Sequence, residues 1–202
     1  MKKLVEKLIN EGVLKNKSII DSFIKTDRKD FITSEYKKDA YQDIALSIGF
    51  GQTISQPFTV AFMLELLQPK LGDDILDVGS GSGWTTALLS QIVGENGKVF
   101  GTEIIPELVK FGSSNLKKFN FKNTKIIQSK PNIIGLPSEA PFDKILVSAS
   151  SDTLPKEFIH QLKIGGTIVI PIKESIWKIS KKSEIEIEIE KFDGFKFVPL
   201  IK

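Results

Sequence analysis

The chain has 202 residues, of which 41% are hydrophobic, and a formal net charge of +3. That length and apolar content predict one globular domain with a substantial core, and so small a charge gives no reason to expect nucleic acid or a membrane surface as a partner. The absence of cysteine excludes disulfides, thiolate chemistry and cysteine-bound metals, and one histidine, His160, argues against a histidine metal centre or a serine triad.

The sequence also bears on the compartment. No stretch approaches the roughly 20 apolar residues of a membrane span, and the basic N-terminus at residues 1–4 is not followed by the apolar region of a secretory signal. We therefore expect a soluble, cytoplasmic protein with no metal, and we expect it to be a monomer.

The N-terminal part is predicted to begin with two helices, at residues 3–10 and 18–25, because apolar side chains recur there at helical spacing. Residues 27–30 are charged and are expected to form a solvated turn. Residues 41–57 combine glycines, hydroxyls and amides without a clear period, which is typical of a binding loop on a rigid scaffold or of an ordinary connection. A third helix follows, with its apolar face formed by Val60, Met63, Leu64 and Leu67.

The central part carries the strongest motif of the chain. A buried strand at residues 75–78 is followed by glycines at every second position and then by a helix at residues 84–93: Asp77-Val78-Gly79-Ser80-Gly81-Ser82-Gly83. Glycines let a backbone approach a ligand closely, and the N-terminus of the helix offers free N–H groups. The next strand, residues 98–103, ends in Glu103, a carboxylate placed to hold a ribose.

This pairing of a glycine-rich turn with an acidic strand end resembles the cofactor motif of Rossmann-like methyltransferases that use S-adenosylmethionine. A dinucleotide dehydrogenase fits less well, because the third glycine comes one position earlier than the G-x-G-x-x-G spacing requires. The plain alternative is a glycine-rich loop that binds no ligand.

Strands and helices alternate after the motif, with helices at residues 106–119 and 155–162 and strands at 125–128, 142–148 and 167–170. This order predicts an α/β fold, a Rossmann-like doubly wound sheet that is mostly parallel with helices on both faces. Residues 176–179, 185–190 and 195–200 read as antiparallel strands at its C-terminal end. We expect one domain over residues 1–202, with an N-terminal helical cap and loop at 1–58 and the Rossmann-like core at 59–202.

A second resemblance is more specific. The loop Gly49-Phe50-Gly51-Gln52-Thr53-Ile54-Ser55-Gln56-Pro57 is similar to the signature loop of protein-L-isoaspartate O-methyltransferases, and it precedes the glycine motif by the right distance. Further segments resemble that family in the same order along nearly the whole chain: Leu4–Leu8 with Gly12, Arg28 with Phe31, Tyr41–Asp43, Ala140–Asp143, Gln161 and Leu162 with Gly165 and Gly166, and Phe197–Leu200.

The resemblance implies a repair enzyme. Members of the family methylate the free carboxylate of L-isoaspartyl residues in damaged proteins or peptides, using S-adenosylmethionine and no metal. The ester collapses to a succinimide, which hydrolyses partly to aspartate. A carboxylate has a pKa of about 4 and is already ionised at neutral pH, so it needs no strong general base.

The resemblance also implies roles for particular residues. Ser55 corresponds to the active-site serine, which we interpret as positioning the substrate carboxylate rather than attacking it. The segment at Val198, Pro199 and Leu200 is expected to border the peptide substrate. The remaining expected contacts are with the cofactor, and they come from Thr53, Ile54, Asp77, Gly79, Gly81, Gly83, Glu103, Ser129 and Ser148.

One departure from the family concerns the adenine. The family's Gly-Asp-Gly after the third strand is replaced here by Ser129-Lys130-Pro131, and lysine has donors but no acceptor for an adenine amino group. We therefore expect weak adenine recognition, unless Gln128, Ser129 or Asn132 receives the adenine instead. Two other functions stay open: a carboxyl methyltransferase of another peptide acceptor, and a homologue that binds cofactor or peptide without turnover.

Overall fold

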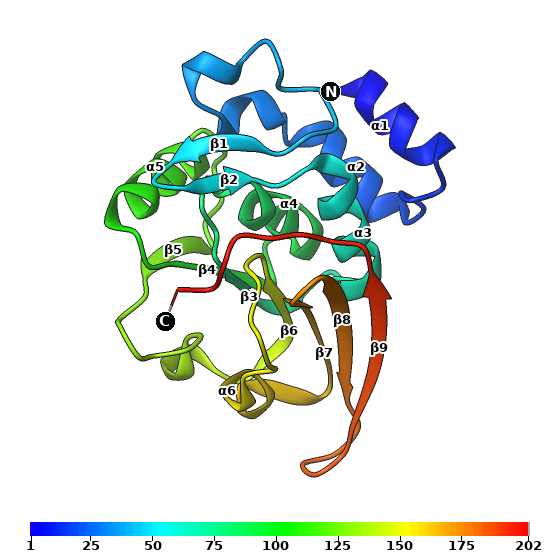
Figure 1. The fold of residues 1–202 in the computed structure, drawn as a ribbon, viewed down its shortest axis with the longest axis vertical. Coiled ribbons are helices and arrows are strands. Elements are labelled where there is room, and N and C mark those ends of the chain that lie inside the picture. The colour runs from blue at the N-terminus through cyan, green and yellow to red at the C-terminus, as the bar shows by residue number, and fades with distance from the viewer. Residues whose placement is uncertain (202) are drawn as a thin grey trace.

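A seven-stranded sheet runs through the molecule in the computed structural model, which describes residues 1–201 (Figure 1). The strand order is β5-β4-β3-β6-β7-β8-β9, with parallel pairing from β5 to β7 and antiparallel pairing of the last two strands. The fold class expected from the sequence is confirmed. The strands are β3 (Asp74–Val78), β4 (Lys98–Glu103), β5 (Thr124–Gln128), β6 (Phe142–Val147), β7 (Leu162–Ile172), β8 (Ser175–Lys181) and β9 (Ile187–Asp193).

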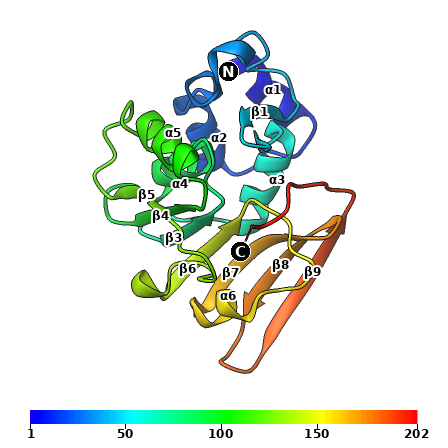
Figure 2. The same ribbon diagram turned by 60° about the vertical axis from the view of Figure 1, so that its left-hand side comes forward.

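The helices cover the two faces of the sheet unequally (Figure 2). Alternate strand residues such as Ile75 and Leu146 pack in one apolar cluster with five helices: α1 (Lys2–Asn10), α2 (Lys17–Lys25), α3 (Pro57–Leu67), α4 (Trp84–Val93) and α5 (Pro106–Leu116). Their neighbours Leu76 and Ile145 pack in a second cluster with Phe158 of the short helix α6 (Lys156–His160). Because both faces are covered, the central strands β3 and β6 bury apolar residues on both sides.

The contact between α4 and the sheet depends on one glycine. A Cβ at Gly101 in β4 would lie 2.9 Å from Ile126 and 3.0 Å from the Thr86 hydroxyl of α4. Glycine at this position therefore lets the helix approach β4 closely. As a result, the N-terminal end of α4 lies beside the carboxyl ends of β3 and β4.

Three expectations about loops and strands were wrong. Residues 41–57 are not an irregular loop throughout but contain a hairpin of β1 (Leu46–Gly49) and β2 (Gln52–Ile54). Residues 195–200 form no strand, and only an isolated bridge joins Pro199 to Ser150. The charged residues 27–30 are not a solvated turn, because Arg28 begins the 3-10 helix η1 (Arg28–Phe31) and is 0% exposed.

The hairpin and the C-terminal segment both lie over the carboxyl edge of the sheet, as Figure 1 shows in cyan and red. Two further 3-10 helices, η2 (Ser34–Tyr36) and η3 (Pro137–Glu139), lie in connecting segments. Within residues 1–201, no helix has the length and apolar character that crossing a membrane requires.

Candidate active site

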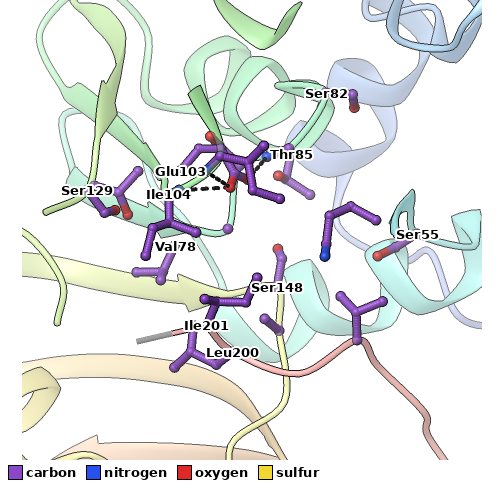
Figure 3. A pocket seen from close by; sticks show the side chains of 18 of the residues that line it. Ser55, Val78, Ser82, Thr85, Glu103, Ile104, Ser129, Ser148, Leu200 and Ile201 are labelled. Atoms are coloured by element: carbon purple, nitrogen blue, oxygen red, sulfur yellow. Dashed lines mark hydrogen bonds between the residues drawn. The ribbon is translucent and has the colours of Figure 1, made fainter. Parts of the chain in front are cut away.

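A cavity opens at the carboxyl ends of β3, β4 and β6, where the strand order reverses and open α/β sheets bind their ligands. It encloses about 990 Å³ of empty space, part of which is open to solvent. Its walls come from the β1–β2 hairpin, the glycine-rich turn, the end of β4, residues 129–135 and the C-terminal segment. In the view of Figure 3, Ser55 and Ser129 flank the cavity from opposite sides and Ser148 lies between them.

The glycine-rich turn is fixed against β4. The N–H groups of Gly79 and Ser80 both donate to the Thr102 carbonyl, over 2.8 and 3.0 Å. Gly79 and Gly81 have φ of +76° and +48°, in the region that favours glycine, and both line the cavity. The turn therefore presents bare backbone to the cavity just before α4 begins.

Glu103 lies at the end of β4 on the cavity wall and is 7% exposed. Its Oε1 accepts hydrogen bonds from the N–H groups of Ile104 (2.8 Å) and Ile105 (3.0 Å), and its Oε2 accepts one from Gly81 (3.0 Å). These three donors hold the carboxylate in one orientation. A carboxylate oxygen can accept two hydrogen bonds, so Oε2, which accepts one, retains capacity for a ligand.

Asp77 lies behind the turn rather than on the cavity wall. It is fully buried, and its Oδ2 accepts hydrogen bonds from the hydroxyls of Thr85 (2.7 Å) and Thr86 (2.6 Å). Burial raises the pKa of Asp77 from 3.8 to about 6, the two hydroxyls oppose that rise, and the charge of Glu103 adds to it. Asp77 thereby holds the first turn of α4, and its influence on the cavity passes through Thr85, which does line it.

Gly83 also lies outside the cavity wall. A Cβ there would meet the Gly112 carbonyl of α5 at 3.1 Å, so this glycine permits contact between the turn and a helix. The expected contacts of Asp77 and Gly83 with the cofactor stay predictions.

The hairpin supplies the opposite wall, where Thr53, Ile54 and Ser55 follow one another. Thr53 pairs with Ser47 across the hairpin, and the tip that joins the strands has positive φ at Gly49, Phe50 and Gly51. Ser55 is partly buried, lines the cavity and lies two residues before Pro57, the first residue of α3. The hairpin thus places Ser55, which follows β2 directly, on the cavity wall.

The remaining expected residues line the cavity from the sheet and the C-terminal segment. Ser129 donates its N–H to the Glu103 carbonyl (2.8 Å), and Ser148 donates its N–H to the Val78 carbonyl (2.9 Å). The C-terminal segment, with Val198, Pro199 and Leu200 on the wall, is held by Ser150. The Ser150 N–H donates to Val198 (2.8 Å), and the Leu200 N–H donates to Ser150 (2.7 Å).

The segment that departs from the family contributes Ser129 and Lys130 to the wall, whereas Gln128 and Asn132 do not line the cavity. The buried side chain of Gln161 supports the end of this segment. Its oxygen accepts from the Leu136 N–H (2.7 Å), and its amide donates to the Ile134 carbonyl (2.8 Å). Of the three residues considered as alternative adenine acceptors, Ser129 alone lines the cavity, and its contact with adenine stays a prediction.

The sequence as a whole matches a known family. Residues 1–202 match the family model described as Protein-L-isoaspartate(D-aspartate) O-methyltransferase (PCMT). The chain belongs to this family. Among PCMT relatives, the protein-L-isoaspartate O-methyltransferase of Flavobacterium psychrophilum is 42% identical, over 98% of this chain and 92% of the relative. The enzyme of Pyrococcus horikoshii is 40% identical, over 99% of this chain and 92% of the relative. That of Methanopyrus kandleri is 38% identical, over 98% of this chain and 90% of the relative.

Solved PCMT structures have the same fold. The crystal structure of a putative protein-L-isoaspartate O-methyltransferase from Plasmodium falciparum in complex with S-adenosyl-L-homocysteine superposes with a TM-score of 0.87 at 29% identity, covering 98% of this chain and 97% of the other. A second protein-L-isoaspartate O-methyltransferase structure gives a TM-score of 0.89 at 27% identity, covering 98% of this chain and 65% of the other.

Sequence reasoning missed several residues of this PCMT cavity. Ile104 and Ile105 line it and orient Glu103, and their position directly after the acidic strand end was the available signal. Phe158 also lines the cavity although α6 is distant in sequence, and no local pattern distinguishes it from a core residue. Within residues 1–201, no group of three or more His, Cys, Asp or Glu side chains is arranged to hold a metal ion.

Proposed function

We propose that this chain transfers the methyl group of S-adenosylmethionine to the free carboxylate of L-isoaspartyl residues in damaged proteins or peptides. The observation that carries the proposal is the single cavity in which the signature hairpin, the glycine-rich turn and Glu103 meet, in a chain that matches the family from end to end. The relatives named above carry the same activity in their names.

The residues of the cavity suit this cofactor. Two buried hydroxyls on the wall, Ser80 Oγ and Thr102 Oγ1, have no hydrogen-bond partner among residues 1–201, and buried polar atoms are ordinarily paired. Glu103 would accept hydrogen bonds from the ribose hydroxyls, and Gly79 and Gly81 would admit the methionine and ribose portions against bare backbone. When bound, S-adenosylmethionine supplies an electrophilic methyl group on its sulfonium.

The chain's own task is to align the acceptor and to exclude water. We assign Ser55 a hydrogen bond to the isoaspartyl carboxylate, with Thr53 and Ile54 beside it at the reactive end of the cavity. Because the carboxylate is ionised at neutral pH, no side chain has to remove a proton. Holding two reactants in a reactive geometry can lower an activation barrier by roughly 7–11 kcal/mol. We propose that alignment of the carboxylate with the methyl group is the main contribution of this cavity to the rate.

The peptide is proposed to lie along the C-terminal segment. The Val198 carbonyl and the Leu200 N–H are both bonded to Ser150. Because successive carbonyls of an extended chain point to opposite sides, the carbonyl of Pro199 points away from Ser150. An extended peptide can pair with backbone groups presented in this way.

We also propose that residues 1–202 form a single domain, with 1–58 as cap and 59–202 as core, and that the protein is a cytoplasmic monomer.

The test is methylation of matched peptides. The protein is incubated with labelled S-adenosylmethionine and a peptide in its isoaspartyl and aspartyl forms, and base-labile methyl esters are counted. Label on the isoaspartyl form alone supports the proposal. Equal label on both forms would indicate another acceptor, and cofactor binding without any label would indicate a binding protein without turnover. Light scattering of the same preparation tests the monomer.

A further inference from the structure

Arg28 is a fully buried cation in the N-terminal part of the chain and does not line the cavity. Its guanidinium lies 5.4 Å from the ring centroid of the buried Trp84, the first residue of α4 and a residue of the cavity wall. Burial lowers the pKa of Arg28 to about 10, and the charge of Asp43 acts in the opposite direction. Because a buried charge is costly unless it is well bonded, the bonds of Arg28 call for an explanation.

The four terminal N–H groups of Arg28 meet four backbone carbonyls. Nη1 donates to Ala40 (3.0 Å) and Gln42 (3.2 Å), and Nη2 donates to Ile44 (2.8 Å) and Ser55 (3.2 Å). The first three carbonyls belong to the segment that leads into β1, and the fourth belongs to the serine that follows β2. One planar group therefore joins the two ends of the hairpin.

A second contact fixes the same region from the other side. The carboxylate Oδ1 of Asp43 accepts a hydrogen bond from the Phe58 N–H (2.8 Å) in the first turn of α3. Asp43 lies between Gln42 and Ile44, whose carbonyls Arg28 holds. Arg28 thus holds the backbone at the Ser55 carbonyl, and Asp43 holds it at the Phe58 N–H, three residues after Ser55.

We propose that Arg28 is a positioning residue for methyl transfer: it fixes the backbone of Ser55, and so the direction of the Ser55 hydroxyl, without touching cofactor or peptide. The inference rests on the proposed function of Ser55. Lysine cannot replace Arg28, because an ammonium offers three donors from one nitrogen, whereas the guanidinium fork reaches four carbonyls in one plane.

The proposal separates turnover from cofactor binding. The cofactor-facing turn is held by hydrogen bonds to the Thr102 carbonyl and to Glu103, and none of these bonds involves Arg28, whose contact with α4 is through the Trp84 ring. In Arg28→Met we expect kcat to fall at least tenfold, while the Kd of S-adenosylhomocysteine and the KM of S-adenosylmethionine stay within threefold. Arg28→Lys is expected to be intermediate in kcat. Lys29→Met, at the exposed neighbouring cation, is the matched control and should behave as wild type.

Hydrogen exchange gives a readout that needs no activity. In Arg28→Met, the amides of residues 42–55 should exchange at least tenfold faster than in wild type, and those of β3 should be unchanged. An unchanged kcat would overturn the proposal. So would a parallel loss of kcat and cofactor affinity with faster exchange in β3, because that pattern marks a general structural role.

If Arg28→Met does not fold, Arg28→Lys provides the same comparison of kcat, Kd and exchange. If the wild type methylates no isoaspartyl peptide, the proposed function fails by itself, and the exchange of residues 42–55 still decides whether Arg28 holds the hairpin.

Discussion

Removal of the Glu103 carboxylate is expected to weaken cofactor binding strongly. We assign this group the ribose hydroxyls, and a hydrogen bond to a charged acceptor contributes roughly 1.5–3 kcal/mol. At about 1.4 kcal/mol for each factor of ten, Glu103→Ala should raise the Kd of S-adenosylhomocysteine roughly 10- to 100-fold. Titration calorimetry on the wild type and the variant measures this change directly.

The same substitution removes the acceptor of three backbone donors, from Gly81, Ile104 and Ile105. A buried donor left without a partner costs about 1–3 kcal/mol. Because the cavity admits water to this site, part of that cost is recovered. We expect the free energy of unfolding of Glu103→Ala, measured with denaturant and no ligand, to fall by about 2–4 kcal/mol.

Two further variants separate the binding effect from the structural one. Glu103→Gln keeps an oxygen for Ile104 and Ile105 but directs an amide N–H₂ toward the Gly81 N–H, so its stability loss should be smaller while the charge is still removed. Glu107→Ala, at an exposed carboxylate in the first turn of α5, is the matched control. If folded Glu103→Ala binds S-adenosylhomocysteine within twofold of wild type, the ribose assignment is refuted.

Three other predictions concern the serine, the adenine segment and the buried acid. Ser55→Ala should lower the rate of methylation about 10- to 100-fold with little change in cofactor Kd, because the lost hydrogen bond acts on the transition state; wild-type turnover would make Ser55 structural only. Combining Ser129→Gly, Lys130→Asp and Pro131→Gly should tighten S-adenosylhomocysteine binding severalfold by adding an amino-group acceptor worth roughly 1–2 kcal/mol; equal or weaker binding would show that the natural segment already has an adenine partner. For Asp77 the folded-state pKa of about 6 is above the ordinary 3.8, so ionisation of this carboxyl lowers the stability of the fold as pH rises through that interval. The unfolding free energy of wild type should therefore fall, relative to that of Asp77→Asn, by about 2–3 kcal/mol between pH 4 and pH 7. Parallel pH profiles of the two proteins would contradict this prediction.

Local patterns were sufficient to predict the central part of the fold. The strand ending at Val78, the glycine turn and the strand ending at Glu103 each follow from a few neighbouring residues. The turn needs positive φ, and each strand has a short apolar run, Ile75-Leu76 or Val99-Phe100, ahead of its carboxylate. Their proximity follows from the rule that parallel strands place their carboxyl ends at one edge.

The errors lie where distant residues decide the structure. Arg28 looks like a surface charge within its own segment, and its burial depends on carbonyls up to Ser55 that no local pattern reveals. Residues 195–200 have the composition of a strand, yet Pro199 has no N–H, and within residues 1–201 the only β-bridge to this segment is that between Pro199 and Ser150. The hairpin at residues 46–54 was missed because its strands are only four and three residues long and its turn includes a non-glycine residue, Phe50, at positive φ.

The strand order has a consequence for ligand-linked stability. Strands β3 to β5 and strands β6 to β9 are two runs of sequential neighbours, and within the sheet they meet along one seam, β3 against β6. The cavity lies at the carboxyl end of that seam, with Gly79 on one side and Ser148 on the other. A cofactor bound there would contact both halves, and its binding would stabilise the folded state by roughly 2.7 kcal/mol at a hundred times Kd. We therefore expect the resistance of the protein to unfolding and proteolysis to increase with the concentration of its methyl donor.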